Sequence, residues 1–166
     1  QWPEPVKLRA ADNKTDIYGV VFRPTDFDPN KQYPVIDYAL GLSIAAIAPK
    51  GSFFSDVNSA VGYLPAAAWA ELGFIVVIID GRGTAYRNKK FHDESYGQQH
   101  TASNLEDHIT GIQQLAERYP YIDINRVGIT GPGGCNAPAY GLLAYPEFYK
   151  VGVACSVYDP HLMFGF

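Results

Sequence analysis

The sequence predicts an α/β fold, with a mostly parallel sheet and helices on both of its faces. Residues 73–80 form an unbroken apolar run rich in β-branched side chains, which is typical of a central strand buried on both faces. Residues 103–119 repeat apolar side chains at helical spacing. Residues 126–139 lead from a short strand through glycines into a helix. Strands that alternate with helices favour a layered α/β domain.

Size and composition restrict the class of protein. The chain has 166 residues, 47% of them hydrophobic, so we expect residues 1–166 to form a single domain. The net charge of −4 comes from interspersed charges of both signs, which predicts neither a nucleic-acid partner nor a membrane partner. No stretch approaches the roughly 18 apolar residues of a membrane span, and the first residues lack the pattern of a signal peptide. We therefore expect a soluble protein.

The first half of the chain predicts a hairpin, a strand and a short helix. Residues 7–23 alternate around a polar turn at 12–15, which is typical of a β-hairpin. Residues 34–38 form the next apolar strand. Residues 65–73 carry a proline near the start and a glycine just past the end, the arrangement expected of a short helix.

A polar segment follows the central strand at residues 81–99. It contains a cluster of basic side chains, namely Arg82, Arg87, Lys89, Lys90 and His92. The cluster is compatible with an anion site or with a solvated crossover loop. The loop is the favoured interpretation, because connecting segments are ordinarily charged.

The helix predicted at residues 103–119 has a clear beginning. Ser103 and Glu106 have the spacing of a capping box, and Pro120 ends the helix. His108 lies on the apolar stripe, which predicts a packed, hydrogen-bonded core histidine. The four histidines show no metal-ligand spacing, so we expect no metal and no cofactor.

Residues 126–139 have the layout of a nucleophile elbow. A strand at 126–130 leads into a glycine-rich turn, and Asn136 is placed to cap a helix at 137–144, whose first turn tolerates Pro138. An elbow of this kind presents a serine in the pattern G-x-S-x-G. Here the glycines are present and the serine is absent.

Three motifs carry a resemblance to a known family. They are Ile79-Asp-Gly-Arg-Gly-Thr84, Tyr121-Ile-Asp-Ile-Asn-Arg-Val-Gly-Ile-Thr130 and Tyr145-Pro-Glu-Phe-Tyr-Lys-Val-Gly-Val153. In order and spacing they resemble the catalytic domain of the prolyl oligopeptidase family of serine peptidases, in particular its dipeptidyl peptidase IV-like branch. The resemblance runs from about Pro3 to Asp159 and implies a partial α/β-hydrolase fold. No β-propeller domain is present in the sequence.

The resemblance implies that catalytic groups are missing. The family's serine falls on Pro132 or Gly133, and neither can be a nucleophile. Leu40 stands where the family has the tyrosine whose hydroxyl donates to the oxyanion. Asp159 and His161 follow the elbow in the right order but are too close together to complete a triad. We therefore predict a fragment or degenerate homologue that is not catalytically competent. A peptide substrate is implied by the family alone.

Two alternatives stay open. Cys135 is a candidate nucleophile near a helix N-terminus, although no histidine is placed by sequence to pair with it. The turn from Gly131 to Gly134 is a candidate anion-binding loop at the helix start. However, Asn136 stands where G-x-G-x-x-G requires its last glycine. Cys135 and Cys155 otherwise predict two buried thiols.

The last predicted strand runs from Lys150 to Val157. Its apolar sequence and its place at the sheet edge predict an exposed row of backbone N–H and C=O groups. We therefore expect this chain to associate with a second copy of itself through this strand.

Overall fold

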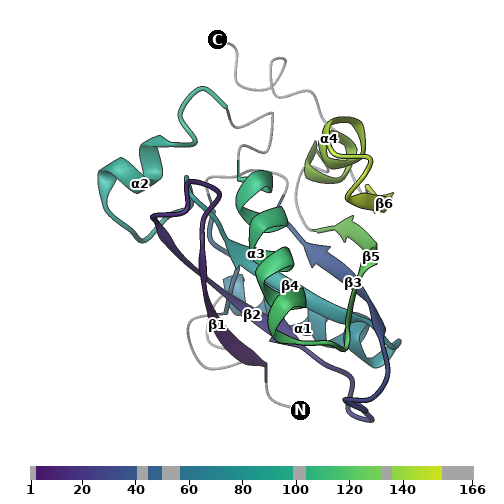
Figure 1. Ribbon diagram of the computed structural model, residues 1–166. Coiled ribbons are helices and arrows are strands. Elements are labelled where there is room, and N and C mark those ends of the chain that lie inside the picture. Colours follow the sequence, from purple (N-terminus) through teal and green to yellow (C-terminus); the bar gives the residue numbers. More distant parts are fainter. Residues whose placement is uncertain (1–2, 41–44, 50–56, 99–103, 132–135, 155–166) are drawn as a thin grey trace.

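The computed structural model describes residues 3–40, 45–49, 57–98, 104–131 and 136–154 (Figure 1). Within these residues six strands form one sheet, in the order β1-β2-β4-β3-β5-β6. In chain order the elements are β1 (Glu4–Arg9), β2 (Asp16–Phe22), β3 (Tyr33–Tyr38), α1 (Val57–Glu71), β4 (Ile75–Asp80), α2 (Lys89–Asp93), α3 (Leu105–Arg118), β5 (Ile122–Thr130), α4 (Asn136–Ala144) and β6 (Tyr149–Val153). The predicted α/β fold is confirmed.

The sheet is mixed in direction. The four adjacent strands β4, β3, β5 and β6 are parallel, whereas β2 is antiparallel to both β1 and β4. The predicted hairpin is responsible for the antiparallel edge. Its turn is held by Asp12, whose carboxylate accepts hydrogen bonds from the backbone N–H groups of Lys14 and Thr15 at 2.9 and 2.8 Å. The expectation of a mostly parallel sheet therefore holds approximately, with this hairpin as the exception.

Strand β4 lies at the centre of the core, as predicted. All six of its residues are buried between β2 and β3. Ile75, Val77 and Ile79 belong to the apolar cluster on one face of the sheet, and Val76 and Ile78 belong to the cluster on the other. Side chains of β4 alternate between the two faces of the sheet, so this one strand contributes to both apolar clusters.

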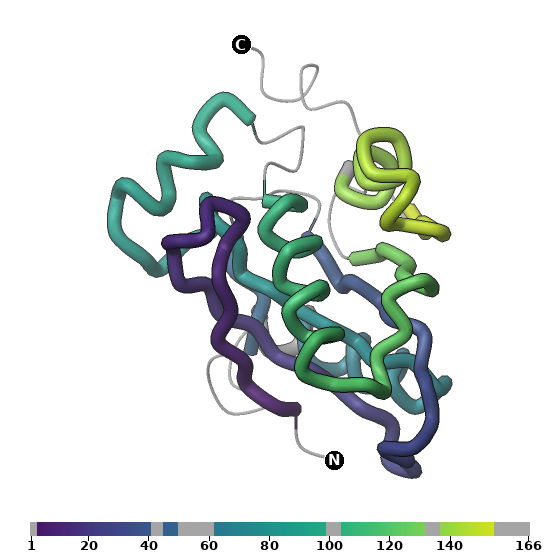
Figure 2. Tube along the Cα trace, viewed as in Figure 1, coloured from purple at the N-terminus to yellow at the C-terminus, as the bar shows by residue number. Residues whose placement is uncertain are grey.

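Helices cover both faces of the sheet. Helix α1 packs against β2, β3 and β4 on one face. Helix α3 packs against β1, β4 and β5 on the opposite face, and α4 lies beside it against β5 and β6 (Figure 2). Among the described helices, none has both the length and the apolar character required to cross a bilayer.

The predicted start of α1 was wrong. The helix begins at Val57, and Pro65 lies inside it. An interior proline removes one backbone hydrogen bond, but Ala66 and Ala70 in the following turns are fully buried, and this packing favours the helix. The predicted end is confirmed, because Gly73 follows with a φ of 93°, a conformation suited to glycine.

Two further expectations need correction. Residues 81–99 are not one loop, because α2 forms within them, capped by the Asn88 side chain, which accepts from the backbone N–H of Phe91 at 2.9 Å. The N-cap of α3 is Asn104, one residue later than predicted, and its side chain makes no capping bond. Strand β5 begins at Ile122, earlier than predicted.

The remaining boundaries agree with expectation as far as they are described. Helix α4 begins at Asn136 and ends at Ala144, within one residue of the prediction. Strand β6 is described to Val153, and residues 155–157 of the predicted strand lie outside the described residues.

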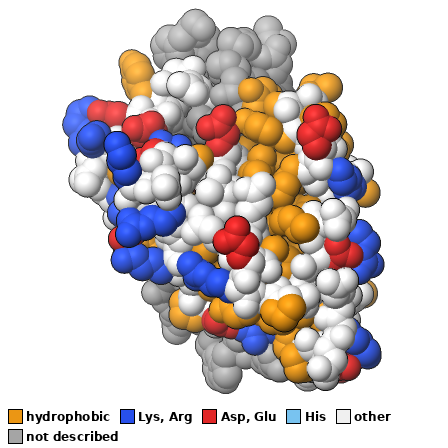
Figure 3. Space-filling view, in the orientation of Figure 1, with side chains coloured by type: hydrophobic (Ala, Val, Ile, Leu, Met, Phe, Trp, Pro, Cys, Tyr) orange, Lys and Arg blue, Asp and Glu red, His pale blue; other side chains and the backbone are white. Residues whose placement is uncertain are grey.

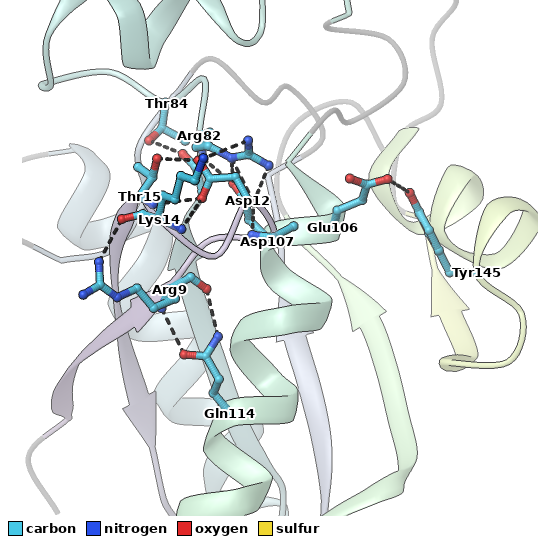
Figure 4. A network of polar contacts seen from close by, with 12 residues as sticks. Arg9, Asp12, Lys14, Thr15, Arg82, Thr84, Glu106, Asp107, Gln114 and Tyr145 are labelled. Atoms are coloured by element: carbon cyan, nitrogen blue, oxygen red, sulfur yellow. Dashed lines mark hydrogen bonds and ion pairs between the residues drawn. The ribbon is translucent and has the colours of Figure 1, made fainter.

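Asp107 in the first turn of α3 joins three segments of the chain (Figure 4). Its carboxylate accepts from the backbone N–H of Arg82 at 2.7 Å, from the Arg82 guanidinium at 2.9 Å and from the backbone N–H of Ala11 at 2.9 Å. The Asp107 side chain is 1% exposed and that of Arg82 is 21% exposed. Asp107 therefore fastens both the hairpin turn and the segment after β4 to α3.

Replacing Asp107 is expected to be costly. Asp107→Asn removes the buried anion that Arg82 contacts and leaves its guanidinium the longer contact with Asp12 at 3.7 Å, so the free energy of unfolding should fall by about 2–3 kcal/mol. Urea unfolding followed by circular dichroism measures this change. Asp93→Asn is the matched control, because its pair with Lys89 is exposed and should contribute less than about 0.5 kcal/mol. Equal losses in the two variants would contradict the role given to Asp107.

Candidate active site

Leu40 and Gly131 lie at neighbouring strand ends. Strands β3 and β5 are parallel, and from Val35 onward they pair in register, with Tyr38 opposite Thr130. The backbone N–H of Ala39 donates to the carbonyl of Thr130 at 2.8 Å, which continues the pairing past both strands. Ligands of parallel α/β sheets bind at the carboxyl ends of the strands. Leu40 and Gly131 therefore lie close together at the edge of the sheet where such folds bind ligands.

Gly131 allows a very close approach between these two strand ends. A Cβ atom added at this position would overlap the carbonyl oxygen of Ala39 and lie 2.6 Å from its carbonyl carbon. No other residue fits without movement of the main chain. The first glycine of the predicted elbow thus has a steric function that is independent of any catalysis.

The structure confirms the two elements that flank the elbow. Strand β5 leads into Gly131, and α4 begins at Asn136. Pro132, Gly133 and Cys135 lie outside the described residues, as does the rest of the candidate anion-binding turn up to Gly134. The roles assigned to these residues stay predictions.

Leu40 is half-buried at the end of β3. It packs against the apolar cluster that lies between the sheet and α1, which contains Tyr38 and Ile47. An aliphatic side chain offers no hydrogen-bond donor. The role assigned to this position in catalysis stays a prediction.

Asp80 is a site residue that sequence reasoning missed. Its buried carboxylate accepts from the backbone N–H groups of Ile47 and Ala48 at 2.9 and 3.1 Å. These bonds fasten the segment that follows Leu40 to the end of β4. The available signal was a lone carboxylate directly after five apolar residues, because a buried carboxylate requires donors.

The basic cluster of residues 81–99 does not converge on one site. The guanidinium of Arg82 is paired with Asp107, and that of Arg87 lies over the rings of Tyr18 and Phe91, 5.4 and 4.4 Å from their centroids. Lys89 pairs with Asp93. Figure 3 shows Lys and Arg side chains over this part of the molecule, interleaved with acidic ones. The arrangement supports a crossover segment rather than an anion site.

His108 is a packed, hydrogen-bonded core histidine, as predicted. It is 2% exposed, and its Nδ1 lies 2.8 Å from Oδ1 of Asp37 in β3. Tyr149 donates its hydroxyl to Oδ2 of the same carboxylate at 2.7 Å. The sequence signal for Asp37, a carboxylate inside an apolar strand, was present but gave no indication of its partners. Within the described part of the chain, no three His, Cys, Asp or Glu side chains are grouped to hold a metal ion.

Sequence comparison identifies the family. Residues 62–165 match the prolyl oligopeptidase family. The chain belongs to this family. It is 30% identical to dipeptidyl peptidase 8 of Homo sapiens over 139 residues, which cover 83% of this chain and 15% of that protein. It is also 30% identical to venom dipeptidyl peptidase 4 of Apis mellifera over 151 residues, which cover 90% of this chain and 18% of that protein.

Structural comparison agrees with this assignment. A crystal structure from Bacteroides ovatus ATCC 8483 that is named for dipeptidyl aminopeptidase IV matches the chain with a TM-score of 0.74 at 32% identity. The match covers 92% of this chain and 21% of that one. The resemblance to the dipeptidyl peptidase IV-like branch of the prolyl oligopeptidase family is therefore confirmed. The chain spans between 15% and 21% of the length of these relatives.

The addition of one methyl group at Gly131 tests its steric function. Gly131→Ala forces the β3 and β5 ends apart, so the free energy of unfolding should fall by about 3 kcal/mol. Gly128→Ala, within the strand that leads into Gly131, is the matched control. Its added Cβ meets nothing closer than 3.4 Å, so stability should change by less than about 1 kcal/mol. Urea unfolding measures both, and a Gly131→Ala variant as stable as the Gly128→Ala control would refute the argument.

Proposed function

We propose that this chain forms the elbow-bearing part of a prolyl oligopeptidase-type hydrolase domain and is not competent in serine hydrolysis. One observation carries the proposal. Gly131 retains the close contact with Ala39 that the elbow scaffold needs, while the adjoining donor position is occupied by Leu40. Pro132 and Gly133 supply no hydroxyl. The scaffold is retained and the reactive groups are replaced.

Serine hydrolysis requires a nucleophile, a base and a carboxylate that orients the base. Of the described histidines, His108 is buried against Asp37, and His92 lies on α2 with its Nδ1 2.9 Å from the Gly83 carbonyl oxygen. Both imidazoles are therefore engaged by other groups. Loss of a single oxyanion donor by itself costs about 3–4 kcal/mol of transition-state stabilisation. These features together support the absence of turnover.

A peptide is the ligand that the relatives favour. The similar proteins are named as dipeptidyl peptidases or aminopeptidases. We propose that a peptide would contact this domain at the carboxyl ends of β3 and β5.

We expect no serine-type hydrolysis by this chain. Incubation with a fluorophosphonate and with an activated ester should give no labelling and no turnover above that of the heat-denatured chain, because no hydroxyl stands at the elbow. Mass spectrometry locates any label. Stoichiometric labelling of a serine near the elbow would overturn the proposal.

A variant with a restored nucleophile and a restored oxyanion donor tests whether the chain also lacks a base. Leu40→Tyr with Gly133→Ser and Cys135→Gly supplies a donor and a nucleophile in the pattern G-x-S-x-G, but it supplies no base. We expect this variant to remain without peptidase turnover. Turnover would show that a base exists within the 166 residues, and His161 would be the first to replace.

Two further measurements on the unaltered chain test the alternative functions, namely a Cys135 nucleophile and an anion-binding loop. Alkylation of Cys135 much faster than that of free cysteine would indicate an activated thiol. Thermal stabilisation by inorganic phosphate would indicate an anion site at Gly131 to Gly134. Either result would replace the proposal with the corresponding function.

We also propose that a second copy of this chain pairs with β6. Among the described strands, β1 and β6 are the two sheet edges, and they differ in character (Figure 1). The outward residues of β1 are Pro5, Lys7 and Arg9, which are typical of an edge that faces water. In β6, Val151 and Val153 are 61% and 48% exposed. Lys150 is the one charged residue of β6, so the described part of this edge carries fewer charges than β1.

An apolar groove adjoins the β6 edge of the sheet. It has a volume of about 470 Å³ and lies on the α1 face of β5 and β6, between Trp69, Phe74, Val151 and Val153. Antiparallel pairing of two β6 strands across a two-fold axis perpendicular to the sheet places both grooves on the same face. The two apolar surfaces then join, which favours a second copy as the occupant.

Light scattering coupled to size exclusion tests this pairing. We expect a dimer, and we expect Val151→Lys to shift it toward monomer because a charge then lies at the interface. Tyr96→Lys is the control, since Tyr96 is 85% exposed just after α2, which lies on the opposite side of the molecule from β6 (Figure 1). A stable monomer at micromolar concentration, or equal effects of the two variants, would contradict the proposal.

A further inference from the structure

A buried polar cluster crosses the face of the sheet that α3 covers. Asp37 of β3 is fully buried, His108 of α3 is 2% exposed and Tyr149 of β6 is 1% exposed. Both carboxylate oxygens of Asp37 are engaged, Oδ1 by His108 at 2.8 Å and Oδ2 by Tyr149 at 2.7 Å. These partners are 71 and 112 residues away from Asp37 in sequence. The cluster therefore joins three elements that are remote along the chain.

The cluster has a defined proton arrangement. Burial, followed by the charge of Asp37, raises the pKa of Tyr149 well above its usual value, so the hydroxyl keeps its proton and donates. Burial alone would lower the pKa of His108. The charge and hydrogen bond of Asp37, with further contributions from Asp107 and Asp80, outweigh burial and raise this pKa above its usual value. The imidazole therefore holds its proton more tightly in the folded chain than in the unfolded chain.

The titratable groups that act on His108 come from four elements. They are Asp37 of β3, Asp107 of α3, Asp80 of β4 and, through Asp37, Tyr149 of β6. Asp107 is paired with Arg82. Asp37 is the anion that the imidazole contacts directly, so the cluster approximates a buried ion pair with a tyrosine donor.

The cluster lies beneath the candidate site. Asp37 precedes Leu40 by three residues on β3, and Tyr149 opens β6 beside Val127 of β5. The Tyr149 ring also packs against α4, where a Cβ added at Gly141 would lie 3.1 Å from a ring carbon. Its contacts thus reach the helix that follows the elbow.

We infer that Asp37, His108 and Tyr149 form a buried clasp that positions β6 and α4 against β3, and that the strength of this clasp depends on the proton of His108. Because the folded chain holds this proton more tightly, the stabilisation is complete below the ordinary pKa of histidine, about 6.5. It is lost as the pH rises through the higher value of the folded chain. The clasp therefore weakens as the pH rises, whether or not the domain has any catalytic activity.

Hydrogen exchange of the 166-residue chain locates the effect. Between pH 6 and pH 9, protection factors corrected for intrinsic exchange should fall severalfold for the amides of β6 and α4. Those of the β1–β2 hairpin, which the cluster does not touch, should stay unchanged. Equal changes in both regions, or none in either, would overturn the inference.

Two conservative variants distinguish the effect of the His108 proton from the effect of side-chain packing. His108→Gln retains an N–H donor for Asp37 without a titrating charge, so the pH dependence of β6 and α4 should disappear. Tyr149→Phe retains the ring and removes the hydroxyl, so protection of β6 should fall at every pH while the pH dependence remains. A His108→Gln variant with the pH dependence of the parent chain would refute the role of the proton.

One measurement needs no variant. Nuclear magnetic resonance of the His108 imidazole in the unaltered chain reports its titration directly. We expect a midpoint above about 6.5. A midpoint below that value would overturn the inference even if a variant fails to fold.

Discussion

The parallel pairing of β3 with β5 is the contact on which the rest of the site depends. It places Leu40 beside Gly131, and it continues past the strands through the bond from Ala39 to Thr130. Two further strands pair directly with these two. Strand β4 lies on the far side of β3 and β6 on the far side of β5. An error in this one register would move both halves of the candidate site.

The fold of this family imposes steric requirements on the chain, and catalysis imposes separate chemical ones. Gly131 satisfies a steric requirement, because the carbonyl of Ala39 occupies the space of any side chain. The nucleophile and the oxyanion donor are chemical requirements, and the fold can form without them. Membership of the prolyl oligopeptidase family therefore follows from the scaffold, whereas activity depends on a few side chains that the scaffold does not need.

Three buried carboxylates organise the segments around the strand ends. Asp80 holds the segment after Leu40, Asp107 holds the hairpin turn and the segment after β4, and Asp37 holds α3 and β6. A buried carboxylate is stable only when donors surround it, so each of these residues permits few arrangements of the neighbouring chain. The apolar core stabilises the layers, and these polar contacts define how the connections lie on top of them.

The sequence by itself determined the elements whose signal is local. The apolar run at β4, the stripe of α3 and the glycines of the elbow depend on short windows of sequence, and so does the absence of a serine at Pro132 and Gly133. Only the tertiary structure decided the partners of His108, the pairing of Arg82 and the function of Asp80. It also decided that α1 continues through Pro65, where packing outweighs local preference. The physical reason is that hydrogen-bond partners far apart in sequence meet through the order of the strands, and no local pattern specifies that order.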